Sequence, residues 1–299
     1  MRRFTVNFLL LFLFRLSSVF LVWTSFVPDE YWQSLEVAHN IVFKYGYLTW
    51  EWKNGLRTYL YPLIFSILYK ILQIFHMDFP SAIILVPRLF QAFLTSVSDY
   101  YFLHWCQKLG CHPYWTSIAI FTNWFWFYCG SRTIVNAFET SITSIALYHY
   151  PWELLYNSST KSKKIITIKS FYLILAVFIC IIRPTAATIW APLVLLHIIA
   201  MDYKHKRELL LRIILPITVF MLSVSVVIDS LLYQKFVITP FEFLKFNLLH
   251  GIASFYGVHP FLWYIMQGIP VVLALQSLPF TFGCITLFCG KLILHSNKN

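Results

Sequence analysis

The stretch FVPDEYWQSLEVAHNIVFKYGYLTWEW, residues 26–52, follows an N-terminal apolar run directly. It sets Asp29 and Glu30 side by side just beyond that run, and further acidic and aromatic residues follow before its end. Adjacent carboxylates at a membrane surface repel each other and are costly to desolvate. An ordinary connecting loop has no need of them, whereas a site that takes a proton from a hydroxyl or holds a cation does.

The composition indicates a protein that crosses a membrane several times. Of its 299 residues, 59% are hydrophobic and 12% are charged, whereas a soluble domain usually has about 25% charged residues. Lysine and arginine number 23 against 12 acidic residues, a formal net charge of +11. That excess fits the positive charge of cytoplasmic loops. Because no basic run is interleaved with aromatic residues in a polar segment, we expect no nucleic-acid partner.

Successive apolar segments predict an all-α, multispanning fold that forms a single transmembrane domain over residues 1–299. The first segment reaches Phe26 and is long enough to span a bilayer, which takes about 20 residues. It lacks the small residues of a cleavage site, so we expect a retained helix, with Arg15 as its polar exception. We expect Arg183-Pro184 to divide one later run into two short helices. The later apolar runs lie approximately at residues 59–76, 82–103, 114–130, 133–151, 170–200, 212–232 and 266–294.

Two basic loops set the predicted topology. Residues 153–169 and 201–212 are rich in lysine and arginine, so we place them and the N-terminus in the cytoplasm. Residues 27–58 and 233–265 then lie on the opposite side. The spans between these loops do not add up, so we expect a segment within 59–103 to re-enter the membrane or lie in its plane. The sequon at Asn157 falls in a cytoplasmic loop and is expected to carry no glycan.

The Asp29-Glu30 pair has two compatible interpretations. After Pro28 the pair suits the N-terminus of a helix, where carboxylates are favoured. The same helix dipole keeps a carboxylate ionised and ready to accept a proton. We therefore treat both residues as catalytic candidates, with Asp29 as the base.

Three other groups are weaker candidates for contact with substrate. In SRTIVNAFET, the spacing of Arg132, Asn136 and Glu139 predicts one helical face, either a self-satisfied polar stripe or a cation for a phosphate. Arg183 has the same two interpretations, since a guanidinium matches phosphate geometry. His259, like His250, is either an interfacial hydrogen-bonding group or a substrate contact.

The sequence carries no strong signal for a metal or a cofactor. Glu36 and His39 stand at positions i and i+3, but a metal site needs a third ligand at suitable spacing. No CxxC pair is present among the six cysteines, and the chain has neither a P-loop nor a GxGxxG followed by a helix. We expect no metal and no cofactor.

Several long motifs resemble those of a known family. They are the opening stretch at 26–52, TYLYPLIFSILYKIL at 58–72, PRLFQAF at 87–93, SRTIVNAFET at 131–140, IIRPTA at 181–186 and FLKFNLLHGIASFYGVHPFLWYIMQGIP at 243–270. Together they resemble the GPI-anchor branch of glycosyltransferase family 22, whose members are multispanning GT-C enzymes of the endoplasmic-reticulum membrane. The resemblance runs in order from about residue 20 to about residue 280.

The resemblance implies an activity and a set of partners. The donor would be dolichyl-phosphate-mannose, the acceptor a GPI glycolipid, and the surroundings the lipids of the endoplasmic-reticulum membrane. Residues 27–58 and 233–265 would be luminal loops, the first of them catalytic. The family's acidic pair maps onto Asp29 and Glu30, with Gln33 following, and Val27 stands where the wider family has histidine. The transfer would be α-1,2 and would add the third mannose.

One departure from the family raises alternatives. The family carries a His-Lys-Glu-x-Arg-Phe motif in a later luminal loop, and no such motif occurs here. We therefore expect the chain to be a truncated form that transfers little or no mannose alone. The alternatives are another lipid-linked-oligosaccharide mannosyltransferase of the same family, a non-catalytic scaffold, or a transporter, to which intramembrane charges would be equally natural.

Overall fold

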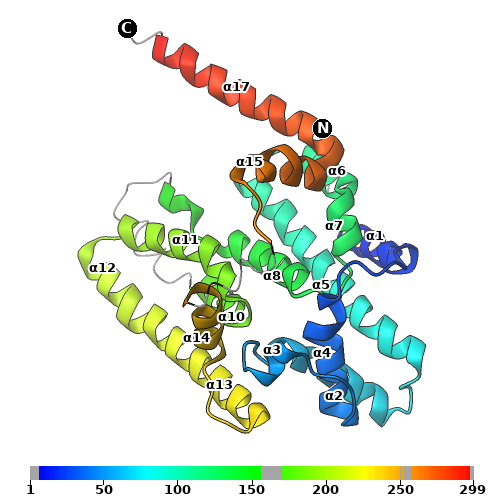
Figure 1. Ribbon diagram of the computed structural model, residues 1–299. Helices are drawn as coiled ribbons and strands as arrows, with labels where there is room; N and C mark the ends of the chain where they lie inside the picture. Colours follow the sequence, from blue (N-terminus) through cyan, green and yellow to red (C-terminus); the bar gives the residue numbers. More distant parts are fainter. Residues whose placement is uncertain (1–6, 156–169, 250, 252–256, 297–299) are drawn as a thin grey trace.

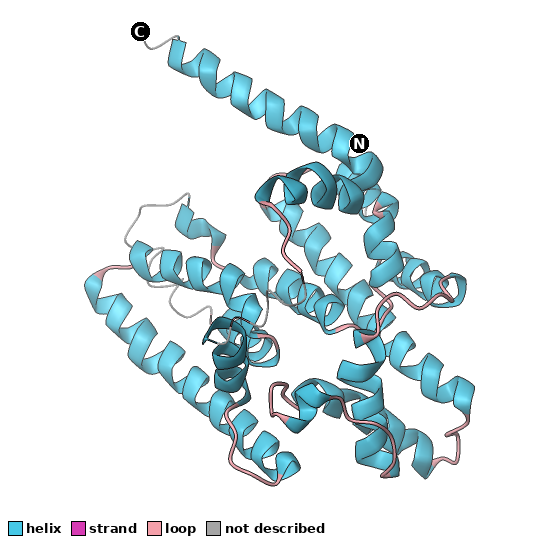
Figure 2. Cartoon of the chain, viewed as in Figure 1, coloured by secondary structure: helices cyan, strands magenta, loops and turns pink. Residues whose placement is uncertain are grey.

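The computed structural model describes residues 7–155, 170–249, 251 and 257–296, and every regular element within these ranges is a helix (Figure 2). Asn157, His250 and most of the predicted basic loop 153–169 lie outside them. The first half of the chain contains α1 Phe8–Leu21, η1 Tyr31–Leu35, α2 Glu36–Phe43, α3 Trp50–Lys53, α4 Leu60–Ile74, α5 Pro80–Lys108, α6 Pro113–Thr122, α7 Trp124–Cys129, α8 Val135–His149 and η2 Trp152–Leu155.

The second half adds shorter pieces around one long helix (Figure 1). They are α10 Phe171–Ile182, η3 Pro184–Ala186, α11 Ala187–Ala200, α12 Tyr203–Glu208, η4 Leu209–Ile214, α13 Leu215–Tyr233, α14 Thr239–Leu244, η5 Lys245–Leu249, α15 Phe261–Trp263, η7 Tyr264–Gly268, α16 Ile269–Leu273, η8 Ala274–Gln276 and α17 Ser277–Ser296. At the top of Figure 1, α17 extends away from the rest of the chain.

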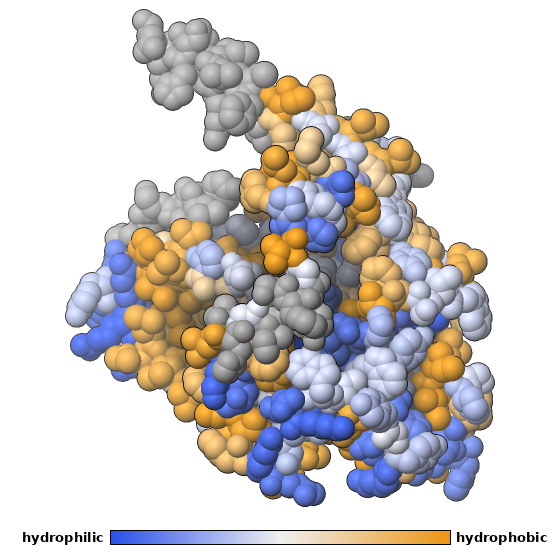
Figure 3. All heavy atoms as spheres, in the orientation of Figure 1, coloured by the Kyte–Doolittle hydropathy of each residue, from blue (hydrophilic) through white to orange (hydrophobic). Residues whose placement is uncertain are grey.

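Three helical stretches are long and apolar enough to cross a membrane, namely Pro80–Lys108, Tyr203–Tyr233 and Phe261–Thr286. Together with four shorter apolar helices, they confirm the predicted all-α membrane fold. On the face shown in Figure 3, hydrophobic side chains cover much of the long helix that ends at Tyr233, and hydrophilic ones gather at the lower edge near α3. Apolar side chains on the outside of a helix are expected where lipid surrounds it.

Helix α5 packs against α1 and α8, and α10 packs against α8. The main core joins α4, α8 and α10. Aromatic side chains fill its centre, among them the buried Phe65 of α4, Phe138 of α8 and Tyr172 of α10. With 15 residues, α4 is shorter than the about 20 that a full span needs. It is the described helix that best fits the expected re-entrant or in-plane segment within 59–103, which stays a prediction.

Two predicted irregularities have clear physical causes. Pro184 lacks an N–H and restricts the residue before it to extended backbone; Arg183 is extended, and the predicted division into α10 and α11 is confirmed. Arg15, the exception within α1, is fully buried, and its Nε donates to Asp99 of α5 at 2.6 Å. Asp99 also accepts from Trp126 Nε1 at 3.0 Å, so this charged pair joins α1, α5 and α7.

Candidate active site

The predicted acidic pair begins the helical turn that leads into η1. The amide of Glu30 donates to the carbonyl of Val27 at 3.2 Å, and that of Tyr31 donates to Pro28 at 3.0 Å. Both carboxylates thus lie at a helix N-terminus, where the dipole favours negative charge. Their side chains have opposite surroundings, because Glu30 is buried and Asp29 is exposed.

Glu30 is sealed in an ion pair with Arg132. Arg132 Nη1 donates to Glu30 Oε2 at 2.8 Å, and the two side chains are 1% and 3% exposed. The remaining nitrogens of Arg132 are also used, since Nη2 donates to the Thr24 carbonyl at 2.5 Å and Nε to the Tyr128 carbonyl at 3.1 Å. The Glu30 carbonyl accepts from the Ser34 hydroxyl at 2.6 Å. A guanidinium with all three nitrogens engaged fixes the loop in place.

Asp29 lies instead at the junction of two cavities. It lines a polar cavity of about 510 Å³ and an apolar cavity of about 620 Å³. A carboxylate that reaches both spaces can contact a substrate with chemically different parts.

Acids, an arginine and aromatic rings line the polar cavity, which lies between the loop 27–58 and α14–η5. Gln33 lowers the pKa of the nearby Asp29 carboxyl and donates to Glu51 at 3.5 Å. Glu51 in turn accepts from Arg57 Nη2 at 2.9 Å. The other lining residues include Trp32, Thr49, Trp50, Phe243 and Asn247. Such a mixture of hydrogen-bonding groups and flat aromatic faces suits a sugar.

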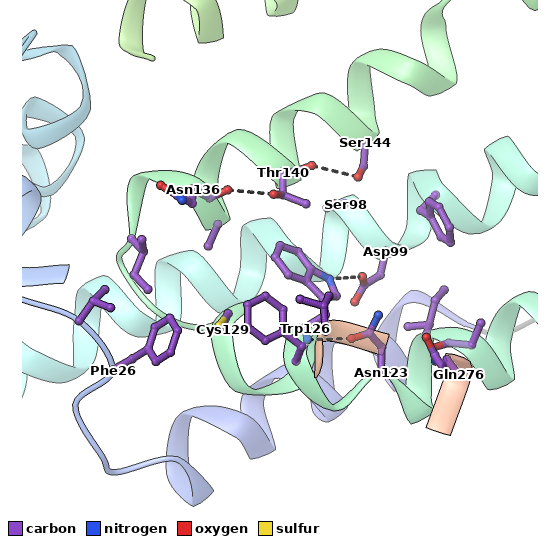
Figure 4. A pocket seen from close by; sticks show the side chains of 18 of the residues that line it. Phe26, Ser98, Asp99, Asn123, Trp126, Cys129, Asn136, Thr140, Ser144 and Gln276 are labelled. Carbon is purple, nitrogen blue, oxygen red and sulfur yellow. Dashed lines mark hydrogen bonds between the residues drawn. The ribbon is translucent and has the colours of Figure 1, made fainter. Parts of the chain in front are cut away.

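The apolar cavity is framed by α5, α7 and α8 (Figure 4). Phe26, Trp126 and Cys129 form part of its wall, and Gln276 reaches it from η8. The predicted single run 114–130 is broken here at Asn123, whose side chain accepts from the amide of Trp126 at 2.9 Å and starts α7. That break turns aromatic residues of α7 toward the cavity, which offers hydrocarbon a place beside Asp29.

The electrostatics of the polar cavity bear directly on Asp29. Partial burial raises the pKa of its carboxyl above the usual value. The Arg57 cation is the next influence and lowers that pKa, whereas the Glu51 carboxylate raises it. Gln33 and Arg183 lower it further. A general base works best when its pKa lies near the working pH. Its resting form is then still ionised, and it binds the proton that it accepts more tightly.

The structure brings some predicted site residues together and separates others. Asp29 and Gln33 line the polar cavity, and Arg183 lies close enough to influence Asp29. The guanidinium of Arg183 is held by Glu139 of α8. His259 lines neither cavity and stacks on Trp263 with ring centroids 4.1 Å apart.

The expectation that Arg132, Asn136 and Glu139 share one helical face is wrong. The backbone is extended at Ile134, and α8 begins only at Val135. Arg132 therefore lies outside the helix and turns to Glu30, whereas Glu139 pairs with Arg183. Asn136 lines the apolar cavity. The three side chains therefore contact three different parts of the protein.

Sequence reasoning missed Arg57 and Asp229. Arg57 follows the aromatic loop directly and precedes the next apolar run, and a lone cation in that position was the available signal. Asp229 is fully buried in α13 and accepts from the Thr58 hydroxyl at 3.0 Å and the Tyr59 amide at 2.8 Å. It fixes the backbone next to Arg57, although no short-range pattern links positions so far apart.

Comparisons with known proteins identify the family. The family model described as the Alg9-like mannosyltransferase family matches residues 6–297. GPI mannosyltransferase 3 of Drosophila melanogaster is 45% identical over 276 residues, which are 92% of this chain and 46% of that protein. GPI alpha-1,2-mannosyltransferase 3 of Homo sapiens is 43% identical over 272 residues, 90% of this chain and 47% of that protein.

A plant relative, Mannosyltransferase APTG1 of Arabidopsis thaliana, is 39% identical over 268 residues, covering 89% of this chain and 48% of its own length. The chain thus spans about half the length of the curated relatives it matches. No solved structure gives a significant match.

Proposed function

Because the chain belongs to the Alg9-like mannosyltransferase family, we propose that it transfers mannose from dolichyl-phosphate-mannose to a GPI glycolipid in the endoplasmic-reticulum membrane. The names of its relatives support the GPI pathway and an α-1,2 linkage for the third mannose. The observation that carries the proposal is the position of Asp29 between a polar and an apolar cavity. A lipid-linked sugar has a hydrocarbon part and a polar part, and the two cavities suit both.

Asp29 acts as the general base in this proposal. The acceptor hydroxyl oxygen forms a bond to the anomeric carbon of mannose, and its proton passes to the Asp29 carboxylate. The bond from that carbon to the phosphate oxygen breaks, and its electron pair leaves with the phosphate. Such positioned proton transfer typically contributes a factor of about 10²–10⁴.

The neighbouring acid has a different task. Glu30 is buried and fully paired with Arg132, so it holds the loop rather than meeting the substrate. Gln33 lines the same cavity as Asp29 and lowers the pKa of its carboxyl, which favours the ionised form. Thr49 lines the same cavity, and its hydroxyl oxygen is buried without a hydrogen-bond partner within the described part of the chain.

The test uses cells that lack their own GPI mannosyltransferase 3. We expect the chain with Asp29→Asn to restore at most about 1% of the surface GPI-anchored proteins that the unchanged chain restores, at equal protein level. Asp78→Asn changes an exposed aspartate between α4 and α5 and serves as the matched control.

Microsomes from the same cells identify the donor. Label should pass to the glycolipid from dolichyl-phosphate-mannose and not from GDP-mannose when synthesis of the lipid donor is blocked. Full restoration by Asp29→Asn would contradict the assignment of the base. Restoration by the unchanged chain would overturn the expectation from the sequence that residues 1–299 transfer little or no mannose alone, and no restoration would contradict transfer by these residues.

A further inference from the structure

Arg57, Arg132 and Arg183 are three of the arginines near the acidic loop, and they differ in place and in the nitrogens already bound. Arg132 is buried, and Nε, Nη1 and Nη2 each donate a hydrogen bond within the protein. Arg183 is held by Glu139. Arg57 donates through Nη2 to Glu51, and its Nε is buried without an acceptor among the described residues. Of these three, Arg57 is the one that lines the polar cavity, and its hydrogen-bonding capacity is only partly used.

The backbone of Arg57 is fixed while its side chain reaches the cavity. The Tyr233 hydroxyl donates to the Arg57 carbonyl at 2.7 Å, and Asp229 holds the two residues that follow. The guanidinium is 5.8 Å from the ring centre of Phe243, and its side chain is 21% exposed. The guanidinium is therefore held on a rigid support, is partly exposed and has unused donors. Such a group can donate two parallel hydrogen bonds to the oxygens of an anion.

We infer that Arg57 is the anion-binding group of the polar cavity and that Glu51 is an internal counter-ion, which a phosphate ester displaces. The inference rests on the proposed function, because it identifies the donor's phosphate as that anion. In the structure Glu51 occupies one donor of Arg57 and its side chain is also 21% exposed. An ion pair this exposed is weak, so the two non-bridging oxygens of a phosphate diester can replace the carboxylate at Arg57.

The displaced carboxylate keeps one of its present partners. Gln33 donates to Glu51 at 3.5 Å, and Gln33 also lowers the pKa of the Asp29 carboxyl. When the anion takes Arg57, Glu51 keeps its bond to Gln33. Binding of the anion is thereby linked to a side chain that lines the same cavity as the base.

The experiment measures binding of a phosphate probe by the purified chain in nanodiscs, without any transfer reaction. The probes are farnesyl phosphate and inorganic phosphate, each titrated and followed by ³¹P NMR. We expect Arg57→Ala to raise the Kd for farnesyl phosphate about 10- to 100-fold, the usual worth of a charge-assisted hydrogen bond. Arg57→Lys should recover part of this loss, since it keeps the charge but not the planar fork.

Glu51→Gln separates anion binding from a structural role. It removes the competing carboxylate, so we expect it to lower the Kd about threefold or more. A purely structural ion pair predicts the opposite, weaker binding in both variants together with lower thermal stability. The matched control is the exposed pair Arg212–Glu208, where Arg212→Ala and Glu208→Gln should leave the Kd unchanged.

The results distinguish the possible sources of the anion. If inorganic phosphate does not compete with farnesyl phosphate, the ligand is a lipid headgroup. If the two probes bind with equal affinity, the phosphate alone is recognised. Either outcome supports the inference, provided that Arg57→Ala weakens the binding. An unchanged Kd in Arg57→Ala, or a raised Kd in Glu51→Gln, overturns it. If Arg57→Ala does not fold, Glu51→Gln still decides, because it keeps the cation.

Failure here can be told apart from failure of the proposed function. Asp29→Asn should abolish transfer while farnesyl phosphate still binds, since it removes a negative charge near the anion. If Asp29→Asn abolishes transfer but Arg57→Ala binds normally, only the anion site is wrong. If binding depends on Arg57 but Asp29→Asn transfers mannose normally, only the assignment of the base is wrong.

Discussion

Two arginine–carboxylate pairs draw their carboxylates from the loop 27–58, and they are built in opposite ways. The Arg132–Glu30 pair is 1% and 3% exposed, and every nitrogen of the arginine is bonded. The Arg57–Glu51 pair is 21% exposed on both sides and faces a cavity of about 510 Å³. The first pair holds the loop in place, and the second is available to a ligand. Burial and the count of bonded nitrogens, not the residue types, separate the two roles.

The largest expected effect is on stability at the sealed pair. Removing one partner leaves a buried charge uncompensated, so Arg132→Ala should lower the free energy of unfolding by about 3–5 kcal/mol. Arg57→Ala at the open pair should cost about 1 kcal/mol or less. Thermal and chemical unfolding in micelles, with protein level in cells as a second readout, would measure both.

The double variant Glu30→Leu with Arg132→Met removes both charges from the sealed pair. It should recover a large part of the stability lost in Arg132→Ala, since no charge remains unpaired. Equal costs for Arg132→Ala and Arg57→Ala would remove the distinction between the two pairs.

A smaller effect is expected at the support of the open pair. Asp229 Oδ2 accepts from the hydroxyls of Thr239 at 2.7 Å and Ser225 at 3.2 Å, in addition to the bonds of Oδ1 beside Arg57. Asp229→Asn replaces one acceptor oxygen by a donor and should cost about 2 kcal/mol. It should also weaken binding of farnesyl phosphate, because Arg57 loses its rigid backbone. A stability loss with unchanged binding would show that Arg57 does not depend on this support.

The loop that carries Glu51 offers a third, smaller test. Gly46 has a φ of +129°, and a Cβ there would lie 2.7 Å from Glu36 Oε1, which accepts from the Tyr47 amide at 2.9 Å. Gly46→Ala should therefore cost about 1 kcal/mol more than Gly110→Ala, the matched control. Gly110 also has a positive φ of +87°, but its added Cβ would meet nothing within 4 Å. Comparable unfolding midpoints for the two variants would show that Glu36 moves aside without cost.

The smallest expected effect is a shift in the pH dependence of transfer. Asp29 must be ionised to accept a proton, so the rate should fall as the pH drops through its pKa, which burial raises above the usual value. Glu51 raises that pKa, so Glu51→Gln should move the fall in rate to lower pH. The expected shift is below about one pH unit. A shift to higher pH would contradict the influence of Glu51 on Asp29.

Much of the fold followed from the sequence because local patterns determine it. Apolar runs of helical length placed most helices, and Pro184 after Arg183 predicted the division of α10 from α11. The opening stretch also drew attention to Asp29, which lies beside two cavities in the structure. Its assignment as the base stays a prediction.

What the sequence could not provide was the choice of partners for each charge. Arg15 finds Asp99 84 residues away, and Glu30 finds Arg132 102 residues away. Helical periodicity reports only neighbours three or four residues apart, so it placed Arg132 beside Glu139 in error. Because neighbouring positions in the sequence carry no information on distant partners, Glu30 and Asp29 could not be distinguished from the sequence. Only the packing of distant segments separates a sealed carboxylate from an open one.

The distance in sequence between Arg15 and Asp99 also bears on how the protein is made. The segment α1 is synthesised before α5, and an arginine at the centre of a membrane helix costs about 2.5–3.5 kcal/mol on insertion scales. Its partner leaves the ribosome 84 residues later, so Asp99 cannot compensate the charge of Arg15 until α5 has been made. The Arg15–Asp99 pair therefore links the stable placement of α1 in the membrane to the arrival of α5.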